Sequence, residues 1–290
     1  GRPPGVDGDR GGLVIHDFDP IARSTTGLMR RAVTAQRMVP DKVAAVLTTL
    51  LDGRAFGEKH GKDAATVVAL HGWARNRSDW GSTLEGLDAL ALDQPGFGAT
   101  PAPEEAWGSK EYAEWLAQIL EGLDRPVLVG HSFGGRVAVQ LAAARPELVR
   151  GIVLTGVPLF RPKTGGKPKL AYRIGRWLHS KGLIPEARME ALREKYGSTD
   201  YRNAKGIIRD IFVKVVNESY GDQLAAIPKD LPVRLIWGEN DTAAPVWMPG
   251  EAMEILGENA TLEIVPGSAH LLDAGLVKSL RGAIDELRTN

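Results

Sequence analysis

The chain has 290 residues, of which 43% are hydrophobic and 25% are charged, as is typical of a soluble globular protein. Its 36 basic and 36 acidic side chains balance, so no net charge draws it to nucleic acid or to an anionic membrane surface. No apolar stretch approaches the ~20 residues of a membrane span, and the absence of cysteine excludes disulfides, thiolate nucleophiles and thiolate metal sites. We therefore expect a soluble, cytoplasmic protein with no nucleic-acid partner and no membrane span.

The first fifty or so residues precede the predicted sheet. Residues 1–20 are polar and rich in glycine and proline, without the apolar segment of a signal peptide, so we expect a disordered leader. Over residues 22–52 apolar side chains recur at helical spacing, and Pro40 divides the pattern into two amphipathic helices. The second predicted helix has an apolar face made of Val43, Val46, Leu47 and Leu50.

From residue 65 onward, short apolar runs alternate with helical patterns. Six runs are apolar throughout or nearly so, as expected of strands buried on both faces: residues 65–70, 87–92, 126–130, 151–156, 233–238 and 261–265. Helical patterns lie between or after them, over residues 109–123, 134–145, 249–257 and 276–288. This alternation predicts an α/β fold with a mostly parallel central sheet and helices on both faces.

One long segment interrupts the alternation. About seventy residues between the fourth and fifth runs contain no convincing strand, which is too many for a simple crossover connection. We expect a helical lid over residues 157–230, inserted into a core made of residues 1–156 and 231–290. Residues 203–220 contribute a broad apolar face at helical spacing.

The first part of this insertion is strongly basic. Between residues 161 and 181 no acidic residue interrupts a series of basic ones: Arg161, Lys163, Lys167, Lys169, Arg173, Arg176 and Lys181. Such a series is either a solvated face or a surface that favours an anionic substrate or partner.

A serine flanked by glycines follows the third apolar run, in the stretch LVGHSFGG at residues 128–135. A turn from strand to helix within about two residues forces its middle residue into a strained backbone conformation, and Gly130 and Gly134 leave room for it. Ser132 is then exposed at the carboxyl edge of a parallel sheet, where ligands bind, beside the N–H groups of a helix start. The sequence thus predicts a nucleophile at Ser132, the alternative being a glycine-rich turn capped by serine.

A nucleophilic serine needs a base within hydrogen-bond reach, and the base needs a carboxylate that orients it. Among the six histidines, His270 is the best candidate, because it lies in the loop PGSAHLLD just past the last apolar run. The carboxylate is expected at a strand end between serine and histidine in the sequence. There we predict Asp241, with Glu239 in reserve.

Backbone N–H groups are expected to stabilise the oxyanion of an acyl-transfer reaction. One is that of Phe133, directly after the nucleophile, and the other is that of Trp73, in the loop LHGWARN that follows the first apolar run.

Five stretches in this order resemble the α/β-hydrolase superfamily: LHGW at 70–73, LDQPGFGAT at 92–100, GHSFGG at 130–135, LIWGEND at 235–241 and PGSAH at 266–270. The resemblance covers residues 65–156 and 233–285 and is to the cofactor-free esterases, lactonases and carbon–carbon bond hydrolases with a helical lid. It implies a triad of Ser132, His270 and Asp241, no cofactor or metal, and a D-x-P-G-x-G turn over residues 93–98 near the site. Haloalkane dehalogenases and epoxide hydrolases carry an aspartate at the serine position, so the sequence argues against both.

We predict a serine hydrolase of the carboxylesterase type that cleaves a small-molecule ester through an acyl-enzyme. A lactonase or a carbon–carbon bond hydrolase with the same triad is one alternative. A small-molecule receptor on a hydrolase fold, with a vestigial triad, is another. The sequence does not indicate which acyl-chain length of the substrate is preferred, and it is compatible with a monomer or a homodimer.

Overall fold

The computed structural model describes residues 45–161, 170–196 and 199–289. The predicted leader over residues 1–20 lies outside the described residues, as does most of the helical pattern over residues 22–52. The middle of the basic series in the insertion, Lys163 to Lys169, lies outside them as well.

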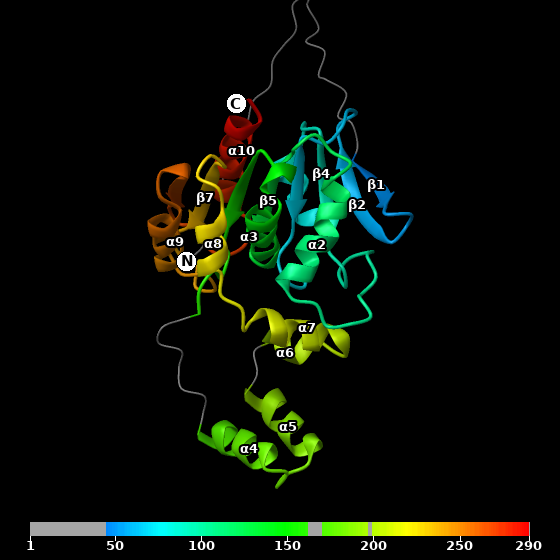
Figure 1. Ribbon diagram of the computed structural model, residues 1–290, viewed down its shortest axis with the longest axis vertical. Helices are drawn as coiled ribbons and strands as arrows, with labels where there is room; N and C mark the ends of the chain where they lie inside the picture. The colour runs from blue at the N-terminus through cyan, green and yellow to red at the C-terminus, as the bar shows by residue number, and fades with distance from the viewer. Residues whose placement is uncertain (1–44, 162–169, 197–198, 290) are drawn as a thin grey trace, which may run out of the picture. The chain divides into compact units, whose positions relative to one another are not determined.

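Eight strands form a single sheet in the order β1-β2-β4-β3-β5-β6-β7-β8 (Figure 1). They are β1 (Val46–Leu50), β2 (Ala55–His60), β3 (Val67–Leu70), β4 (Ala89–Asp93), β5 (Val127–His131), β6 (Gly151–Thr155), β7 (Val233–Gly238) and β8 (Ala260–Val265). The strands from β3 to β8 pair in parallel, whereas β1 and β2 run antiparallel to their neighbours. All six predicted apolar runs are confirmed as the parallel strands β3 to β8.

Helices cover both faces of this sheet, as predicted (Figure 1). Those described are α1 (Gly81–Leu84), α2 (Ser109–Leu120), α3 (Phe133–Ala144), α4 (Leu170–Ser180), α5 (Glu186–Tyr196), α6 (Thr199–Asn203), α7 (Ile207–Val215), α8 (Gly221–Ala226), α9 (Trp247–Leu256) and α10 (Ala274–Thr289). Short 3-10 turns add η1 (Arg77–Trp80), η2 (Pro146–Leu148) and η3 (Gly257–Asn259).

The core lies in two layers because successive strand residues point to opposite faces of the sheet. Val68, Leu128 and Ile152 pack with α2, α3, α8 and α9 on one face. Their neighbours Val67, Val127 and Val153 pack with α1 and α10 on the other. Burial on both faces explains why these strands are continuously apolar in sequence.

The predicted second helix of residues 22–52 is wrong for its last part, because Val46–Leu50 form strand β1. This strand pairs antiparallel with β2, from Val46 opposite Lys59 to Leu50 opposite Ala55. The turn between them contains the Asp52–Gly53 pair, and Leu51, Asp52 and Gly53 all have positive φ. Val46 and Leu47 are exposed on this edge hairpin, so their apolar spacing does not mark a buried helix face.

The order of the strands creates a site at one edge of the sheet. The chain leaves β3 for β4 on one side of the β3–β5 pair, and leaves the neighbouring β5 for β6 on the other side. The loops that follow β3 and β5 therefore diverge at the carboxyl ends of neighbouring strands, which leaves a crevice for a ligand.

The segment between β6 and β7 carries α4 to α8. Ile211 and Val215 of α7 belong to the same apolar core as the sheet, so the predicted apolar face of residues 203–220 is buried there in part, while Val216 is exposed. Arg209 of α7 forms an ion pair with Glu190 of α5.

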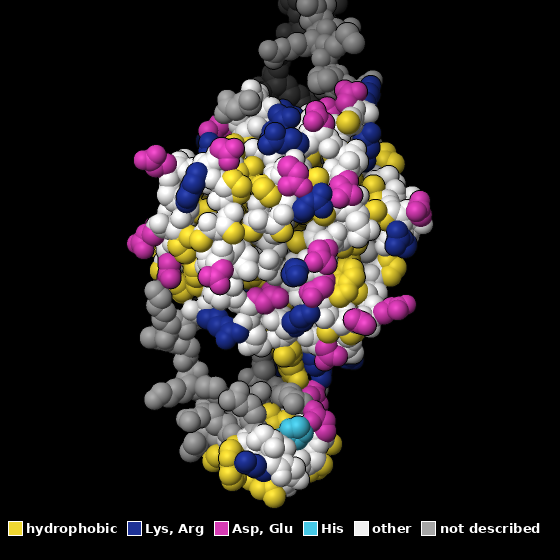
Figure 2. Space-filling view, in the orientation of Figure 1, with side chains coloured by type: hydrophobic (Ala, Val, Ile, Leu, Met, Phe, Trp, Pro, Cys, Tyr) yellow, Lys and Arg dark blue, Asp and Glu magenta, His cyan; other side chains and the backbone are white. Residues whose placement is uncertain are grey.

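Acidic and basic side chains are interspersed over the described surface visible in Figure 2, in keeping with the balanced composition. Among the helices that the structure describes, none combines the length and apolar character that crossing a bilayer demands.

Candidate active site

Ser132 occupies the turn between β5 and α3, and its backbone is strained, with φ of 50° and ψ of −110°. Such a conformation costs of order 1–3 kcal/mol for a residue with a side chain, and it persists only where the surroundings hold it. Here the Ser132 N–H donates to the Thr155 carbonyl of β6 at 2.9 Å, and the Gly135 N–H donates to the Ser132 carbonyl at 3.1 Å. The turn places Ser132 in the wall of a pocket.

The glycines beside the serine are required by close backbone contacts. A Cβ atom at Gly130 would come within 2.5 Å of Gly135 Cα, and one at Gly134 would come within 2.4 Å of the Leu70 carbonyl oxygen. Both contacts are with backbone, which cannot move aside cheaply. The steric role that the sequence predicts for these two glycines is therefore confirmed.

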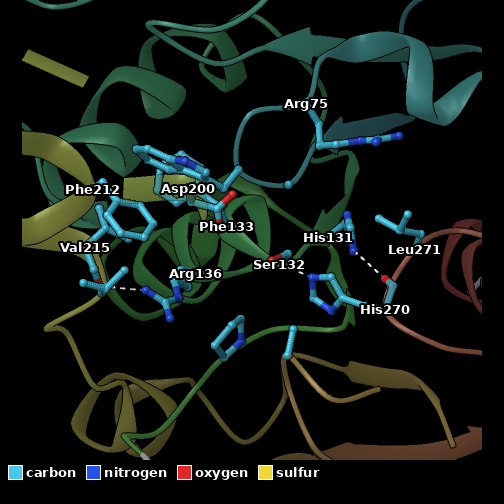
Figure 3. A pocket seen from close by; sticks show the side chains of 15 residues that line it. Arg75, His131, Ser132, Phe133, Arg136, Asp200, Phe212, Val215, His270 and Leu271 are labelled. Atoms are coloured by element: carbon cyan, nitrogen blue, oxygen red, sulfur yellow. Dashed lines mark hydrogen bonds between the residues drawn. The ribbon is translucent and has the colours of Figure 1, made fainter. Parts of the chain in front are cut away.

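The structure brings together the three side chains that the sequence singles out for catalysis. His270 Nε2 lies 3.2 Å from Ser132 Oγ (Figure 3). His270 Nδ1 lies 2.8 Å from Asp241 Oδ2. Asp241 is almost fully buried, and its Oδ1 accepts hydrogen bonds from the N–H groups of Ala243 and Ala244 at 2.9 and 2.8 Å. A buried carboxylate held in this way can fix one ring nitrogen of the histidine while the other faces the serine.

Glu239, the reserve candidate, points elsewhere. Its Oε2 accepts a hydrogen bond from the Gly267 N–H at 3.0 Å, and its side chain is exposed. Glu239 thus ties the loop after β7 to the loop after β8, whereas Asp241 reaches His270 itself.

His131, between Gly130 and Ser132, holds the backbone of the histidine loop, a contact that the sequence does not predict. Its Nε2 lies 2.9 Å from the His270 carbonyl oxygen, to which it donates as the neutral Nε2–H tautomer. Burial, together with the neighbouring His270, lowers the pKa of His131 to about 4. A neutral ring at this position couples the serine turn directly to the loop of His270. In the sequence, the only sign of this role for His131 is its position next to Ser132.

The loop after β3 carries Trp73, and two buried polar side chains hold it. The Gln94 N–H donates to His71 Nε2 at 3.0 Å, and the Gln94 side-chain amide donates to the His71 carbonyl at 2.7 Å. Burial lowers the pKa of His71, which keeps the ring neutral. Trp73 and Phe133 both line the pocket with Ser132, as the predicted oxyanion donors must. Within the described ranges, neither of their N–H groups donates to a protein acceptor.

The predicted turn over residues 93–98 is organised by the carboxylate of Asp93. This group accepts hydrogen bonds from the N–H groups of Arg77 and Ala99, both at 2.8 Å, and forms an ion pair with the Arg77 guanidinium. The turn brings Phe97 against Trp73, with their ring centres 5.0 Å apart.

The pocket has a volume of about 620 Å³, which is within the range of small-molecule sites. Much of its lining is apolar and includes Phe212, Val215 and Val216 from the insertion. Trp73 packs against Phe133 of the serine turn at 5.5 Å and against Phe212 of α7 at 5.0 Å between ring centres.

Three charged residues complete the lining: Arg75, Arg136 and Asp200. Over the part of the chain that the structure describes, no cluster of three or more His, Asp or Glu side chains is suited to hold a metal ion.

Comparison with known sequences and structures bears on this geometry. Residues 67–275 match the sequence pattern of the "Alpha/beta hydrolase family". The chain is 25% identical over 239 residues to a biotin biosynthesis bifunctional protein of Cellvibrio japonicus, a match that covers 76% of this chain and 47% of the relative. It is 27% identical over 232 residues to a pimeloyl-[acyl-carrier protein] methyl ester esterase of Pseudoalteromonas atlantica, with 70% and 86% covered.

The chain thus spans about half the length of the bifunctional relative. Among solved structures, a bacterial membrane phospholipase A is similar with a TM-score of 0.63 at 20% identity, over 85% of this chain and 87% of that one. At that level of identity the likeness concerns the fold alone.

Proposed function

The protein belongs to the alpha/beta hydrolase family, whose sequence pattern matches most of the chain, and we propose that it cleaves small carboxylic esters through a covalent acyl-enzyme. The observation that carries the proposal is the hydrogen-bonded series from Ser132 Oγ through His270 to Asp241, at 3.2 and 2.8 Å, in which Ser132 and His270 line one pocket and Asp241 lies buried behind them.

In the first half-reaction, Ser132 Oγ attacks the ester carbonyl while His270 Nε2 accepts its proton. Asp241 holds the Nδ1–H of His270 and stabilises the imidazolium that forms. The Phe133 and Trp73 N–H groups donate to the oxyanion, and His270 returns the proton to the leaving alcohol. Water, deprotonated by His270, then attacks the acyl-enzyme and releases the acid.

The inserted helices serve as a lid in this proposal. Phe212, Val215 and Val216 of the insertion line the same pocket as Ser132, and Phe212 packs on Trp73 beside the oxyanion site. Apolar walls of this kind favour the carbon chain of an ester and exclude bulk water from the reacting carbonyl.

A fluorophosphonate probe and p-nitrophenyl butyrate test the proposal. Wild-type protein should be labelled and should hydrolyse the ester, while Ser132→Ala should lose labelling and at least about 10⁴-fold in kcat. Ser268→Ala is the matched control, because Ser268 lies in the His270 loop but its hydroxyl group donates a hydrogen bond to Asp273 at 2.9 Å. The control should still be labelled.

The result that overturns the proposal is wild-type turnover in Ser132→Ala, or a wild-type protein that the probe does not label. The second outcome would favour a receptor whose triad is vestigial. Faster turnover of simple lactones or of vinylogous diketones than of esters would keep the triad and change the substrate class.

A further inference from the structure

Arg136 lies one helical turn beyond Ser132, whose carbonyl accepts the Arg136 N–H at 3.3 Å. The residue is only 8% exposed, yet it lines the pocket. In the view of Figure 3, Arg136 and His270 lie on opposite sides of Ser132. A cation is therefore within reach of a molecule that presents its ester to this serine.

The guanidinium group of Arg136 is incompletely paired by the described residues. Nη1 donates to the Val215 carbonyl at 2.6 Å, while Nε is buried with no hydrogen-bond partner. Tyr220 has its ring centre 5.7 Å away, and its side chain favours the charged form both through space and through a hydrogen bond, but a neutral tyrosine is not a counterion. Arginine stays protonated in proteins even where burial lowers its pKa, as it does here. The buried group is therefore a cation.

The nearby acid does not complete the pairing. Glu218 attracts Arg136 through space, but its carboxylate is occupied by the Tyr220 hydroxyl at 2.5 Å and by the Ser109 N–H at 3.1 Å. Within the described ranges, Glu218 and Arg136 interact through space and form no direct hydrogen bond. A buried charge without a hydrogen-bonded counterion is costly, so an anion at this position would be bound favourably.

Arg75, the second arginine of the pocket, differs from Arg136 because an acidic side chain already pairs with it. Its Nε and Nη2 both donate to the carboxylate of Asp79, each at 2.6 Å, and its side chain is well exposed. The acid of the pocket lining, Asp200, is also exposed, so solvent and salt screen its repulsion of an anion. Arg136 is thus the cation in this pocket with buried N–H capacity to spare.

We propose that Arg136 binds a carboxylate of the substrate, so that the site selects esters that carry a second, ionised carboxyl group near the scissile bond. This inference rests on the proposed esterase function and names its substrate class. The planar guanidinium group matches the geometry of a carboxylate, and the apolar walls from Phe212 and Val215 suit the methylene chain between the two ends.

A purely structural role for Arg136 makes different predictions. Val215 is the last residue of α7, and its carbonyl accepts both the Glu218 N–H at 3.1 Å and the Arg136 guanidinium, so Arg136 also helps to cap this helix end. If capping were its whole role, removing the guanidinium would weaken the packing of α7 and lower activity on every ester alike. A role in substrate binding instead changes the ratio between charged and neutral esters.

The experiment compares monomethyl glutarate with its neutral isostere methyl glutaramate, and repeats the pair for succinate and adipate because the spacing is unknown. Wild-type kcat/KM should be about ten- to hundredfold higher for the charged member of the best pair than for the neutral one. A factor of this size corresponds to the contribution of one hydrogen bond to a charged partner. Arg136→Gln should bring the ratio close to one. Arg136→Lys should keep part of it, and Arg75→Gln should keep all of it.

A wild-type ratio near one for all three pairs overturns the proposal, whether or not the variants fold. An unchanged ratio in a folded Arg136→Gln protein overturns it too and leaves the capping role. Calorimetric binding of the same pairs to Ser132→Ala needs no turnover, so it decides the role of Arg136 even if both esters prove inert. Preferential binding of the anionic member would support the anion site even then, whereas the esterase function is decided separately by the probe labelling and the hydrolysis of p-nitrophenyl butyrate.

Discussion

Asp241→Asn tests the proposed relay by changing one atom of the buried carboxylate. Asp241 Oδ1 accepts two backbone N–H groups, from Ala243 and Ala244, while Oδ2 lies 2.8 Å from His270 Nδ1. Asparagine has a single oxygen, and these two backbone donors keep it in the Oδ1 position. Its NH₂ group then faces His270 Nδ1, which must become the hydrogen-bond acceptor.

The consequence is the wrong tautomer of His270, the proposed catalytic base. With the proton on Nε2, His270 cannot accept the proton of Ser132 Oγ, which lies 3.2 Å away. In a serine protease triad the equivalent change lowers kcat about 10⁴-fold. At about 1.4 kcal/mol per factor of ten, this corresponds to about 5.5 kcal/mol of activation free energy. We expect a loss of that size in kcat with KM nearly unchanged, because the pocket walls are untouched.

The assay is steady-state hydrolysis of p-nitrophenyl butyrate, with Glu239→Gln as the matched control. Glu239 is in the same loop, but its carboxylate accepts the Gly267 N–H at 3.0 Å. The control should stay within about threefold of wild type. An Asp241→Asn enzyme that keeps more than about a tenth of wild-type kcat would refute the reasoning. A larger loss in Glu239→Gln would transfer the orienting role to Glu239.

Two further predictions concern the supports of the site. Burial, aided by His270, lowers the pKa of His131 from 6.5 to about 4. As the pH falls through this window the unfolded chain binds a proton that the folded chain does not, so up to roughly 3 kcal/mol of stability is lost. Urea denaturation at about pH 7.5 and 4.5 should show a smaller loss for His131→Asn than for wild type, and equal losses would contradict the assignment. Gly134→Ala should lower both Tm and activity, because its Cβ would meet the Leu70 carbonyl at 2.4 Å and such overpacking costs about 1–3 kcal/mol. Gly122→Ala, whose Cβ would lie 3.6 Å from the Ile119 carbonyl, is its control, and equal stability of the two variants would count against the steric argument.

The parallel core could be predicted because its signal is local. A strand buried on both faces is apolar at every position, so β3 to β8 are visible in the sequence one by one. The hairpin of β1 and β2 has no such signal, since Val46 and Leu47 are exposed at the sheet edge and β2 mixes charged residues with a glycine. Its Asp52–Gly53 turn was the available clue.

In the candidate site, too, some features could be predicted from the local sequence and others depend on the tertiary structure. Ser132 is visible in sequence because a tight strand-to-helix turn needs glycines at fixed offsets, and the order of serine, acid and histidine points to the loops after β7 and β8. The sequence offers both Glu239 and Asp241, and only the path of the loop turns one toward Gly267 and the other toward His270. The catalytic role of the relay stays a prediction until the variants are measured.

The amino-acid sequence by itself determined the layered α/β architecture, the serine at the strand-to-helix turn and the loops whose side chains meet it, because each depends on spacing along a few residues. Tertiary structure alone decided that His131 holds the His270 backbone and that Arg136 reaches Val215 with hydrogen-bonding capacity left over. These contacts join segments 79 and 139 residues apart, so their geometry follows from how strands and helices pack, and no local pattern encodes it.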